Sequence, residues 1–542
     1  MRGVGAEPGE KRKMIVTDLR ESGSTGPGRC PGSRRRELGT LLCLVVAGAA
    51  LRFFRIGHQS FWVDELLTIR AANLGTTLPF DEVFRNIQGP FHAVLVHLVG
   101  SVWISEAALR SLSALFGVAS IPVAYALGAE LFDRRSGLAA AALAAVSPFS
   151  VWYSQELRNY SLLIFFSGLA TLVWWRLIAD RSRAWSGYVV SVVLALLSNL
   201  AAAFLVVAHA VAGAARMRRG RGFLARTVSA WVIILVLMSP WIWGVAHWAA
   251  VDEVADRVTL APLAEEDELL RGRTTFSVAA LPYTFYVFGY GYSLGPSMAE
   301  LHRGSPATAF ARHAGVVAPA ACLWAAALAL GLYRARERGP RLMLILGAIA
   351  VPIAGAGLLA ILNVKPFNPR YVSVMLPVLW VTAGAGVACL GGWGRRLLLA
   401  SLVVCCLVSV GNYHFRPAYW REDVRAAAEY VEAHERPGDV VLIPVVKRVF
   451  DFYFDGDAEV FVVRPGETGS DESVAEAVAA GAEGHGRLWL VDARLWFTDP
   501  EGRIPRHLEA RYGRGERTVF PGSALTLYVL DDTPQVVPSV RG

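Results

Sequence analysis

The sequence is poor in charge, since only 18% of its 542 residues are Asp, Glu, Lys or Arg. Soluble domains carry about a quarter. The missing charge leaves long apolar runs, many of them near the roughly 20 residues that a helix needs to cross a bilayer. The shortage therefore excludes an ordinary soluble protein and predicts a polytopic α-helical membrane protein.

Cysteine is also scarce. All six cysteines lie in the polar N-terminal tail or in apolar runs, and none belongs to a CxxC or Cys/His pattern. These positions argue against a disulfide framework and against a zinc site of standard spacing. The polar C-terminal part lacks a phosphate loop and a nucleophile elbow, and the chain has no internal repeat.

The net charge of +8 does not indicate nucleic-acid binding. The arginines fall in short clusters between the apolar runs, such as Arg134-Arg135 and the stretch from Arg216 to Arg221. Clusters of this kind are typical of loops held on the cytoplasmic side of a membrane. The positive charge therefore indicates topology, and we expect no nucleic-acid partner.

Eleven crossings satisfy these charge clusters, with the N-terminus in the cytoplasm and the C-terminus outside. The run 91–104 is too short to cross and is expected to be interfacial or re-entrant. The run 185–215 is expected to be a hairpin of two short helices that turns at Ser198-Asn199. The expected spans are 37–54, 109–131, 136–153, 157–179, the two arms of 185–215, 225–246, 311–333, 341–363, 371–391 and 396–412.

Polar segments flank this membrane domain, which we place at residues 37–412. Residues 1–36 form a Gly- and Pro-rich tail that is expected to be disordered in the cytoplasm. Residues 413–542 predict a small extracytoplasmic α/β domain. Its expected elements are a helix over 421–434, strands over 439–446, 459–463 and 487–492, and a hairpin over 517–530 that turns at Pro521-Gly522.

An acidic pair, Asp64-Glu65, follows the first span on an aromatic footing of Phe61 and Trp62. Taken alone, such a pair is more often a solvated loop than a site. The aromatic rings are expected to anchor it at the membrane interface, where charged groups are costly and usually functional. We therefore treat Asp64 and Glu65 as catalytic candidates.

A second polar group separates two apolar spans on the same outer face. It contains Glu156 and Arg158 among Tyr153, Gln155 and Tyr160. So few polar residues between two spans must lie at the membrane surface or face a cavity. A tight surface turn and a substrate site fit this pattern equally well.

A third group, Lys365, Arg370 and Tyr371, places two cations outside, against the positive-inside bias. Such cations need an anionic neighbour, which is either a lipid headgroup or a specific phosphate. Arginine forms bidentate contacts with phosphate oxygens, and lysine acts as a point charge. A carboxylate base, a phosphate clamp and aromatic rings on one face are what sugar transfer from a lipid phosphate requires.

Five segments occur in a fixed order along the chain: FWVDE, GPFHAVLVHLVG, EAALRSLSALFGVASIPVAYALG, SPFSVWYSQELRNYSLL and RYVSVMLPVL. In this order they resemble bacterial members of the protein-mannosyltransferase-like superfamily. These are GT-C fold glycosyltransferases of family 39 type, and they include aminoarabinose and galacturonic-acid transferases that act on lipopolysaccharide. The resemblance covers roughly residues 37–412.

The resemblance implies an inverting, extracytoplasmic transferase of the cell membrane whose donor is a sugar on polyprenyl phosphate. It implies that Asp64 is the general base or orients the acceptor, that Glu65 completes the acidic pair, and that Arg370 binds the phosphate. Glu156 and Arg158 match a second-loop motif whose acidic residue orients substrate or binds a cation. A divalent cation is left open, with Asp64 and Glu156 as its ligands.

The chain departs from the family at two places. It has Gly89-Pro90-Phe91 where relatives often have a double proline, and Ser198-Asn199 where a histidine is common. Asn199 is therefore a candidate for donor or acceptor choice, and the resemblance implies no particular sugar.

Two other functions remain open from the sequence. A transporter or flippase for lipid-linked sugars would use the same chemistry, but transporters tend to show internal repeats and broken helices at mid-membrane. A scaffold that presents the C-terminal domain would not need the clustered charges of Asp64, Glu156 and Arg370.

Overall fold

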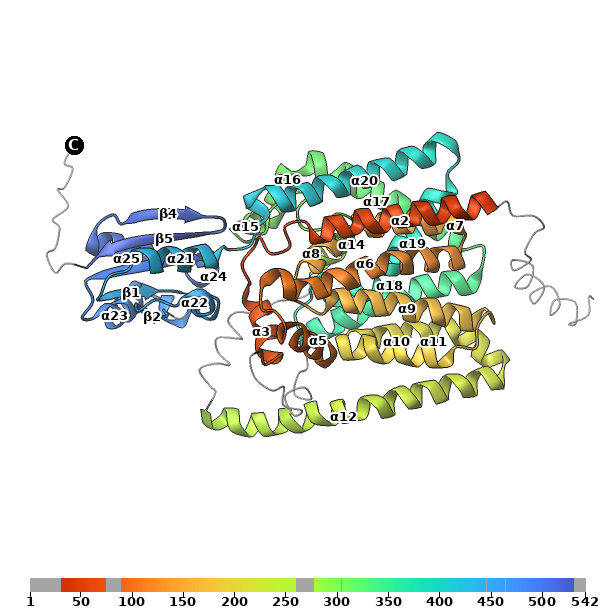
Figure 1. Ribbon diagram of the computed structural model, residues 1–542, viewed down its shortest axis with the longest axis horizontal. Coiled ribbons are helices and arrows are strands. Elements are labelled where there is room, and N and C mark those ends of the chain that lie inside the picture. The colour runs from red at the N-terminus through yellow and green to blue at the C-terminus, as the bar shows by residue number, and fades with distance from the viewer. Residues whose placement is uncertain are drawn as a thin grey trace, which may run out of the picture.

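The computed structural model describes residues 31–74, 89–259, 277–303, 305–444, 446–463 and 465–530. Most of the predicted N-terminal tail, and residues 75–88 of the predicted first outer loop, lie outside the described residues. The described part is a bundle of helices that carries a smaller α/β domain at one end (Figure 1).

Each of the eleven predicted spans is helical, at least in its main part. The bundle contains α2 (Pro31–Phe53), α3 (Val63–Ala71), α5 (Pro90–Gly100), α6 (Glu106–Leu131), α7 (Arg134–Val146), α8 (Pro148–Ser154), α9 (Tyr160–Ile178), α10 (Trp185–Ser198), α11 (Ala202–Arg219), α12 (Arg221–Thr259), α14 (Ala280–Tyr290), α15 (Met298–Arg303), α16 (Pro306–Arg312), α17 (Ala314–Ala335), α18 (Gly339–Ile361), η1 (Pro369–Met375), α19 (Leu376–Cys389) and α20 (Gly392–Phe415).

Seven helical segments among the described residues are long and apolar enough to cross a membrane. An eighth counts if α7 and α8 form one span, bent by 51°. The helices α5, α10 and α11 have shorter apolar parts. The break between α10 and α11 falls at residues 199–201, so the predicted turn is confirmed, whereas eleven crossings stay a prediction.

The bend between α7 and α8 has a local cause. Pro148 begins α8, and it has no N–H to offer the carbonyl of Ala144 one turn earlier. Arg52 of α2 is buried there instead and donates to the carbonyls of Ala144 and Ala145, both at 2.9 Å. The bend delivers residues 155–159 to the end of the bundle that faces the C-terminal domain.

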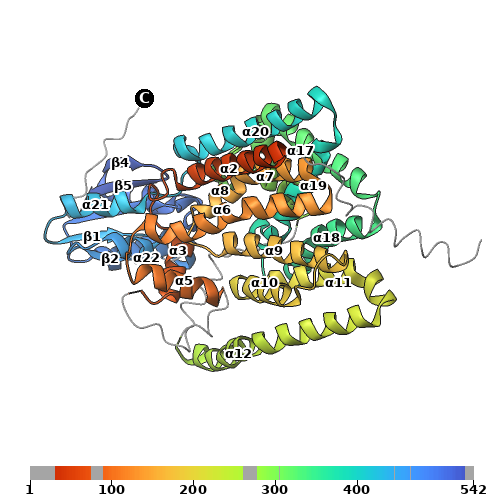
Figure 2. The ribbon, with the colours of Figure 1, turned by 45° about the vertical axis from the view of Figure 1, so that its right-hand side comes forward.

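Close backbone contacts hold the centre of the bundle together. A Cβ atom on Gly128 of α6 would stand 2.9 Å from the Cα of Gly137 on α7, so glycine allows these helices to touch. In the span formed by η1 and α19, 89% of the apolar stretch is buried inside the protein. By contrast, α12 runs along the edge of the bundle, and only 28% of the apolar stretch within Arg221–His247 is buried (Figures 1 and 2).

The C-terminal domain is a five-stranded mixed sheet in the order β2-β1-β3-β5-β4. β1 pairs parallel with β2 and β3, and β5 pairs antiparallel with β3 and β4. Its elements are η2 (Pro417–Tyr419), α21 (Val424–His434), β1 (Asp439–Leu442), α22 (Lys447–Tyr453), β2 (Glu459–Phe461), η3 (Pro465–Thr468), α23 (Asp471–Ala482), β3 (Arg487–Ala493), α24 (Leu495–Thr498), α25 (Arg503–Tyr512), β4 (Glu516–Phe520) and β5 (Ser523–Val529).

Alternating residues of β1 build a core on each face of this sheet. Val441 packs in a cluster with α21 and α22, while Val440 and Leu442 pack with α23 and α25. The predicted helix, the three strands and the turn at Pro521-Gly522 are confirmed, although the first two strands are shorter than predicted.

The C-terminal domain docks on the bundle through specific polar contacts. The hydroxyl of Tyr453 accepts a hydrogen bond from the Phe61 N–H at 2.7 Å and donates to Glu106 at 2.9 Å. Arg425 of α21 pairs with the same Glu106 carboxylate at 2.7 Å. The loop before α3 and the start of α6 therefore form the docking surface, directly beside the predicted acidic pair.

Candidate active site

The predicted acidic pair lies in the first turn of α3, where the bundle meets the C-terminal domain (Figure 2). Glu65 accepts a hydrogen bond from the Trp62 N–H at 3.3 Å, which satisfies one free donor at the helix start. Successive residues of a helix point about 100° apart. Asp64 and Glu65 consequently face different surroundings.

Glu65 is fully buried and bound to Arg110 of α6. Arg110 donates through Nε to Oε1 at 2.8 Å and through Nη2 to Oε2 at 2.7 Å, and the Leu157 N–H donates to Oε1 at 2.7 Å. Burial acts to raise the pKa of Glu65, but the nearby arginines and the Leu157 bond outweigh it and hold the pKa below its usual value. With both oxygens bonded, Glu65 has the geometry of a structural clamp.

Arg110 extends this clamp to the loop before α3. It donates to the carbonyls of Ile56, Gln59 and Ser60 at 3.1, 2.8 and 3.0 Å. Sequence reasoning missed Arg110 because it lies inside a predicted span, where only its charge could have drawn notice.

Asp64 faces Arg370, the predicted phosphate ligand. Asp64 Oδ2 accepts a hydrogen bond from Arg370 Nη1 at 2.7 Å, and each side chain keeps about one fifth of its surface exposed, 20% and 21%. Arg370 Nη2 also lies 3.3 Å from the hydroxyl of Tyr371, and its guanidinium lies 5.9 Å from the ring of Tyr160. Four predicted residues from three distant parts of the sequence thus lie together.

The electrostatics of Asp64 reflect three neighbouring arginines. Burial acts to raise the pKa of Asp64, but Arg158, Arg370 and Arg421 outweigh it and hold the pKa below its usual value. Arg158 also donates to the Asp64 carbonyl at 2.8 Å and to Thr68 Oγ1 at 3.1 Å, so it fixes α3 in place. Asp64 is therefore ionised at neutral pH.

Glu156 is buried beside these groups and pairs with Arg421. Arg421 Nη2 donates to Oε1 at 2.5 Å, while Oε2 has no hydrogen-bond partner among the described residues. Burial raises the pKa of Glu156 to about 7, with Glu65 adding to the rise and Arg421 opposing it. Glu156 can therefore change its protonation state near neutral pH.

The aromatic footing of the acidic pair lies against the C-terminal domain. Phe61 is buried, and its ring centre lies 6.4 Å from that of Tyr453 in that domain. The guanidiniums of Arg421 and Arg494 lie 4.7 and 5.8 Å from the ring of Trp62. Anchoring of the two rings at the membrane interface stays a prediction.

The remaining predicted residues lie around this centre. Tyr153 reaches Tyr292 between their hydroxyls at 3.1 Å, while Gln155 donates to the carbonyls of Arg52 and Phe54 at 2.9 and 2.8 Å. Gln155 thus fastens the end of α2. These contacts suit a supporting role.

Asn199 and Lys365 contact neighbours of the arginines rather than the Asp64–Arg370 pair itself. Asn199 donates at 3.4 Å to Asn159, which follows Arg158 in the sequence. Lys365 is exposed, and its ammonium lies 4.3 Å from the ring centre of Tyr371, which follows Arg370.

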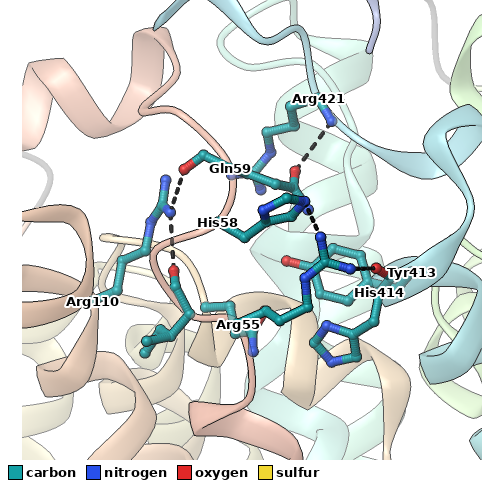
Figure 3. A pocket seen from close by; sticks show the side chains of 9 residues that line it. Arg55, His58, Gln59, Arg110, Tyr413, His414 and Arg421 are labelled. Atoms are coloured by element: carbon teal, nitrogen blue, oxygen red, sulfur yellow. Dashed lines mark hydrogen bonds between the residues drawn. The ribbon is translucent and has the colours of Figure 1, made fainter. Parts of the chain in front are cut away.

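A small pocket lies beside Arg110 and Arg421 (Figure 3). Its lining includes neither Asp64 nor Arg370, so it is separate from their ion pair. Within the described residues, no group of three or more His, Cys, Asp or Glu side chains could hold a metal ion. Asp64 and Glu156 each already have an arginine partner.

Known proteins offer a comparison for this arrangement. Residues 88–243 match the family model described as dolichyl-phosphate-mannose-protein mannosyltransferase, and no curated protein matches the sequence. The structure of ArnT from Cupriavidus metallidurans in the apo state is similar over 91% of this chain and 98% of that one, with 14% identity and a TM-score of 0.52.

Two further structures are similar at the same level. ArnT from the same organism bound to undecaprenyl phosphate gives 14% identity and a TM-score of 0.51, over 90% of this chain and 98% of that one. The oligosaccharyltransferase of Archaeoglobus fulgidus, in a complex with Zn and sulfate, gives 16% and 0.50, over 90% and 72%. The protein has the GT-C fold.

The likeness is not confined to the membrane part of the GT-C fold. The 91% of the chain that is similar to ArnT exceeds what residues 37–412 alone could supply. It therefore extends into the C-terminal domain, which contributes Arg421 and Arg494 to the surroundings of the acidic pair.

Proposed function

We propose that the protein is an integral-membrane glycosyltransferase that moves a sugar from a polyprenyl-phosphate-linked donor to an extracytoplasmic lipid, glycan or protein. The ion pair between Asp64 and Arg370, at 2.7 Å, carries this proposal. It joins a candidate base and a candidate phosphate ligand that lie 306 positions apart in sequence. The similarity in fold to ArnT, which has been solved with undecaprenyl phosphate, supports this class of donor.

Asp64 acts as the general base in this proposal. An acceptor hydroxyl attacks the anomeric carbon, its proton passes to the Asp64 carboxylate, and the bond from sugar to phosphate breaks as the new bond forms. One in-line displacement inverts the anomeric carbon. Arg370 stabilises the charge that develops on the leaving phosphate, because a guanidinium can contact two of its oxygens.

The electrostatics of Asp64 support such a role. In the free protein Arg370 helps to keep the pKa of Asp64 low. A donor phosphate that takes over Arg370 removes part of that effect, and burial then raises the pKa of Asp64. A carboxylate with a higher pKa is a stronger base, so donor binding would prepare Asp64 to accept a proton.

Other predicted residues complete the site in the same proposal. Arg158, Tyr160 and Tyr371 form a cationic and aromatic wall next to Arg370, which suits a sugar phosphate. Glu156 orients the acceptor, and with Asp64 it would hold a divalent cation if the reaction uses one. We assign Glu65 to holding the loop rather than to catalysis, because its oxygens are bonded to Arg110, Leu157 and Trp62.

The location follows from the charge pattern of the sequence. We propose a multi-pass protein of the cell membrane with a cytoplasmic N-terminus and with both the site and the C-terminal domain outside. The helix α3, which carries Asp64, lies at the end of the bundle that carries the C-terminal domain (Figure 1). The ion pairs Asp64–Arg370 and Glu156–Arg421 bring the other central candidates to the same place, which supports one reaction face.

Replacing Asp64 tests the function. Mass spectrometry of envelope lipids, glycans and glycoproteins from a deletion strain should detect the loss of one sugar, which the wild-type gene restores. We expect Asp64→Asn to lower that transfer by about 10²–10⁴-fold, because an amide cannot take the proton. Binding of undecaprenyl phosphate to the purified variant should persist.

Asp471→Asn is the matched control, because it is the same substitution at an exposed position. The Asp471 side chain, on α23, is 82% exposed. This variant should restore the sugar fully. Near-normal transfer by Asp64→Asn would rule out Asp64 as the general base. Movement of a lipid-linked sugar across a liposome membrane without transfer would favour a flippase instead.

A further inference from the structure

A short segment, Arg421 to Asp423, crosses from the last membrane helix to the C-terminal domain over the candidate site. On the bundle side, the Arg421 N–H donates to the Gln59 side-chain carbonyl at 3.1 Å, as Figure 3 shows, and Ser60 Oγ donates to the Glu422 carbonyl at 3.0 Å. The loop that precedes the acidic pair thus holds the segment in place.

The C-terminal domain holds the same segment from the other side. Arg494 donates to the Glu422 carboxylate at 2.8 and 3.1 Å, and the Asp423 N–H donates to the Pro521 carbonyl at 2.9 Å. Gly522 has a φ of +69°, and a Cβ there would stand 3.0 Å from the Cα of Glu422. Two bodies therefore fix the backbone from which the Arg421 side chain extends.

The Arg421 side chain reaches between the buried carboxylates. Its guanidinium donates to Glu156 at 2.5 Å and lies 3.8 Å from Glu65. The rings of Trp62 and Trp152 lie 4.7 and 5.1 Å from it and shield it from water. Cation–π contacts are strongest for desolvated cations, so this geometry favours one fixed position.

Arg421 is the hydrogen-bond donor to the Glu156 side chain. The titratable and charged groups that face Glu156 are Arg421 from the linker, Asp64 and Glu65 from α3, Arg370 from η1, Tyr153 from α8, Tyr292 from the turn after α14 and Tyr413 from α20. Of these, Arg421 alone is hydrogen-bonded to Glu156 in the described structure, and Arg370 is engaged with Asp64.

We propose that Arg421 is a positioning residue, supplied by the linker to the C-terminal domain, that holds the Glu156 carboxyl group in one orientation next to the Asp64–Arg370 pair. The role of Glu156 in transfer rests on the proposed function. The C-terminal domain is then part of the catalytic unit, because its docking sets the place of Arg421.

The expected effect follows from the contact itself. Removal of the guanidinium takes away the hydrogen bond to Glu156 Oε1 at 2.5 Å and leaves this side chain without a hydrogen-bond partner among the described residues. Arg421→Lys keeps a charged donor but lacks the planar guanidinium, so it should restore the contact only in part.

Infrared spectra of the full chain in lipid nanodiscs measure this contact directly. The carboxyl bands that Glu156→Gln removes identify Glu156, and loss of the hydrogen bond from the guanidinium should shift them in Arg421→Gln. Arg517→Gln is the matched control, because Arg517 is 57% exposed and pairs with Asp492 inside the same domain. Its Glu156 bands should equal those of the wild type. Unchanged bands in Arg421→Gln, or an equal shift in both variants, overturn the proposal.

The rate of sugar transfer provides the second readout. At neutral pH we expect Arg421→Gln to lower the rate about tenfold to a hundredfold, with partial rescue by Arg421→Lys. The double variant with Glu156→Gln should be no slower than Glu156→Gln alone, because both changes act through one carboxylate. Additive losses overturn the role. If the wild type transfers no sugar, the proposed function fails, and the infrared bands still decide whether Arg421 holds Glu156.

Discussion

Two neighbouring acidic residues belong to two different regions of this molecule. The Glu65 region is closed: the side chain is 0% exposed and bonded to Arg110 through both oxygens. The Asp64 region is open: the side chain is 20% exposed and uses one oxygen for one nitrogen of Arg370. A single helical turn thus carries a fully bonded carboxylate and, one residue earlier, a carboxylate that stays partly exposed.

The difference in hydrogen bonding between Glu65 and Asp64 indicates which carboxylate stabilises the fold and which one is available to a ligand. A buried carboxylate with every bond made stabilises the loop that carries it, and removing one partner leaves an uncompensated charge. A half-open ion pair loses less when it separates, since water and ligand can replace the partner. Substitutions that strike each region should therefore separate stability from transfer.

Arg110→Ala should produce the largest effect, and the effect should fall on stability. It leaves the Glu65 charge buried and frees three loop carbonyls, so we expect a loss of about 3–5 kcal/mol in unfolding free energy. Thermal unfolding in detergent measures it. Arg134→Ala is the control, because its pair with Glu37 is 44% exposed on the arginine side and should be worth no more than about 1 kcal/mol.

The same pair predicts a pH dependence of stability. The pKa of Glu65 is lower in the folded protein than its usual 4.5, so its stabilising effect is complete above that value and is lost as the pH falls through the folded pKa. The wild type should lose stability in acid more steeply than Arg110→Ala. Equal acid sensitivity in both proteins would mean that the clamp contributes little.

Arg370→Ala should leave stability nearly unchanged but weaken donor binding. The lost charge-assisted contact with phosphate should lower the affinity for undecaprenyl phosphate about tenfold to a hundredfold, measured by titration in nanodiscs. Arg370→Lys should retain part of the affinity, because lysine keeps the charge without the two-pronged geometry. Wild-type affinity in Arg370→Ala would assign Arg370 to holding Asp64 alone.

Much of the fold could be predicted because its signals are local. Apolar length and arginine clusters predicted the helical segments, and alternating apolar residues with a Pro-Gly turn predicted the strands of the C-terminal domain. The charge pattern also predicted that Asp64, Glu156 and Arg370 share one end of the bundle, and the structure brings them together there.

The partners of these charges could not be predicted in the same way. Arg110 and Arg421 meet Glu65 and Glu156 only through tertiary packing, and no spacing in the sequence indicates such pairs. The contacts of Trp62 with Arg421 and Arg494 were hidden for the same reason, because an aromatic residue at a domain contact has no sequence signal of its own. The sequence offers one usable signal for Arg421. It follows the last predicted span on the outer side, the same side as Glu156, with which it pairs.

Lys365 marks the outer limit of the Asp64 region and should give the smallest effect. Its ammonium lies 4.3 Å from the Tyr371 ring and is exposed, and such a cation–π contact is worth about 0.5–1 kcal/mol. Lys365→Met should therefore weaken undecaprenyl phosphate binding by no more than about fivefold, and less at high salt because salt screens exposed charges. A loss as large as that of Arg370→Ala would instead mean that donor binding draws Lys365 inward, so that the open region closes around the phosphate.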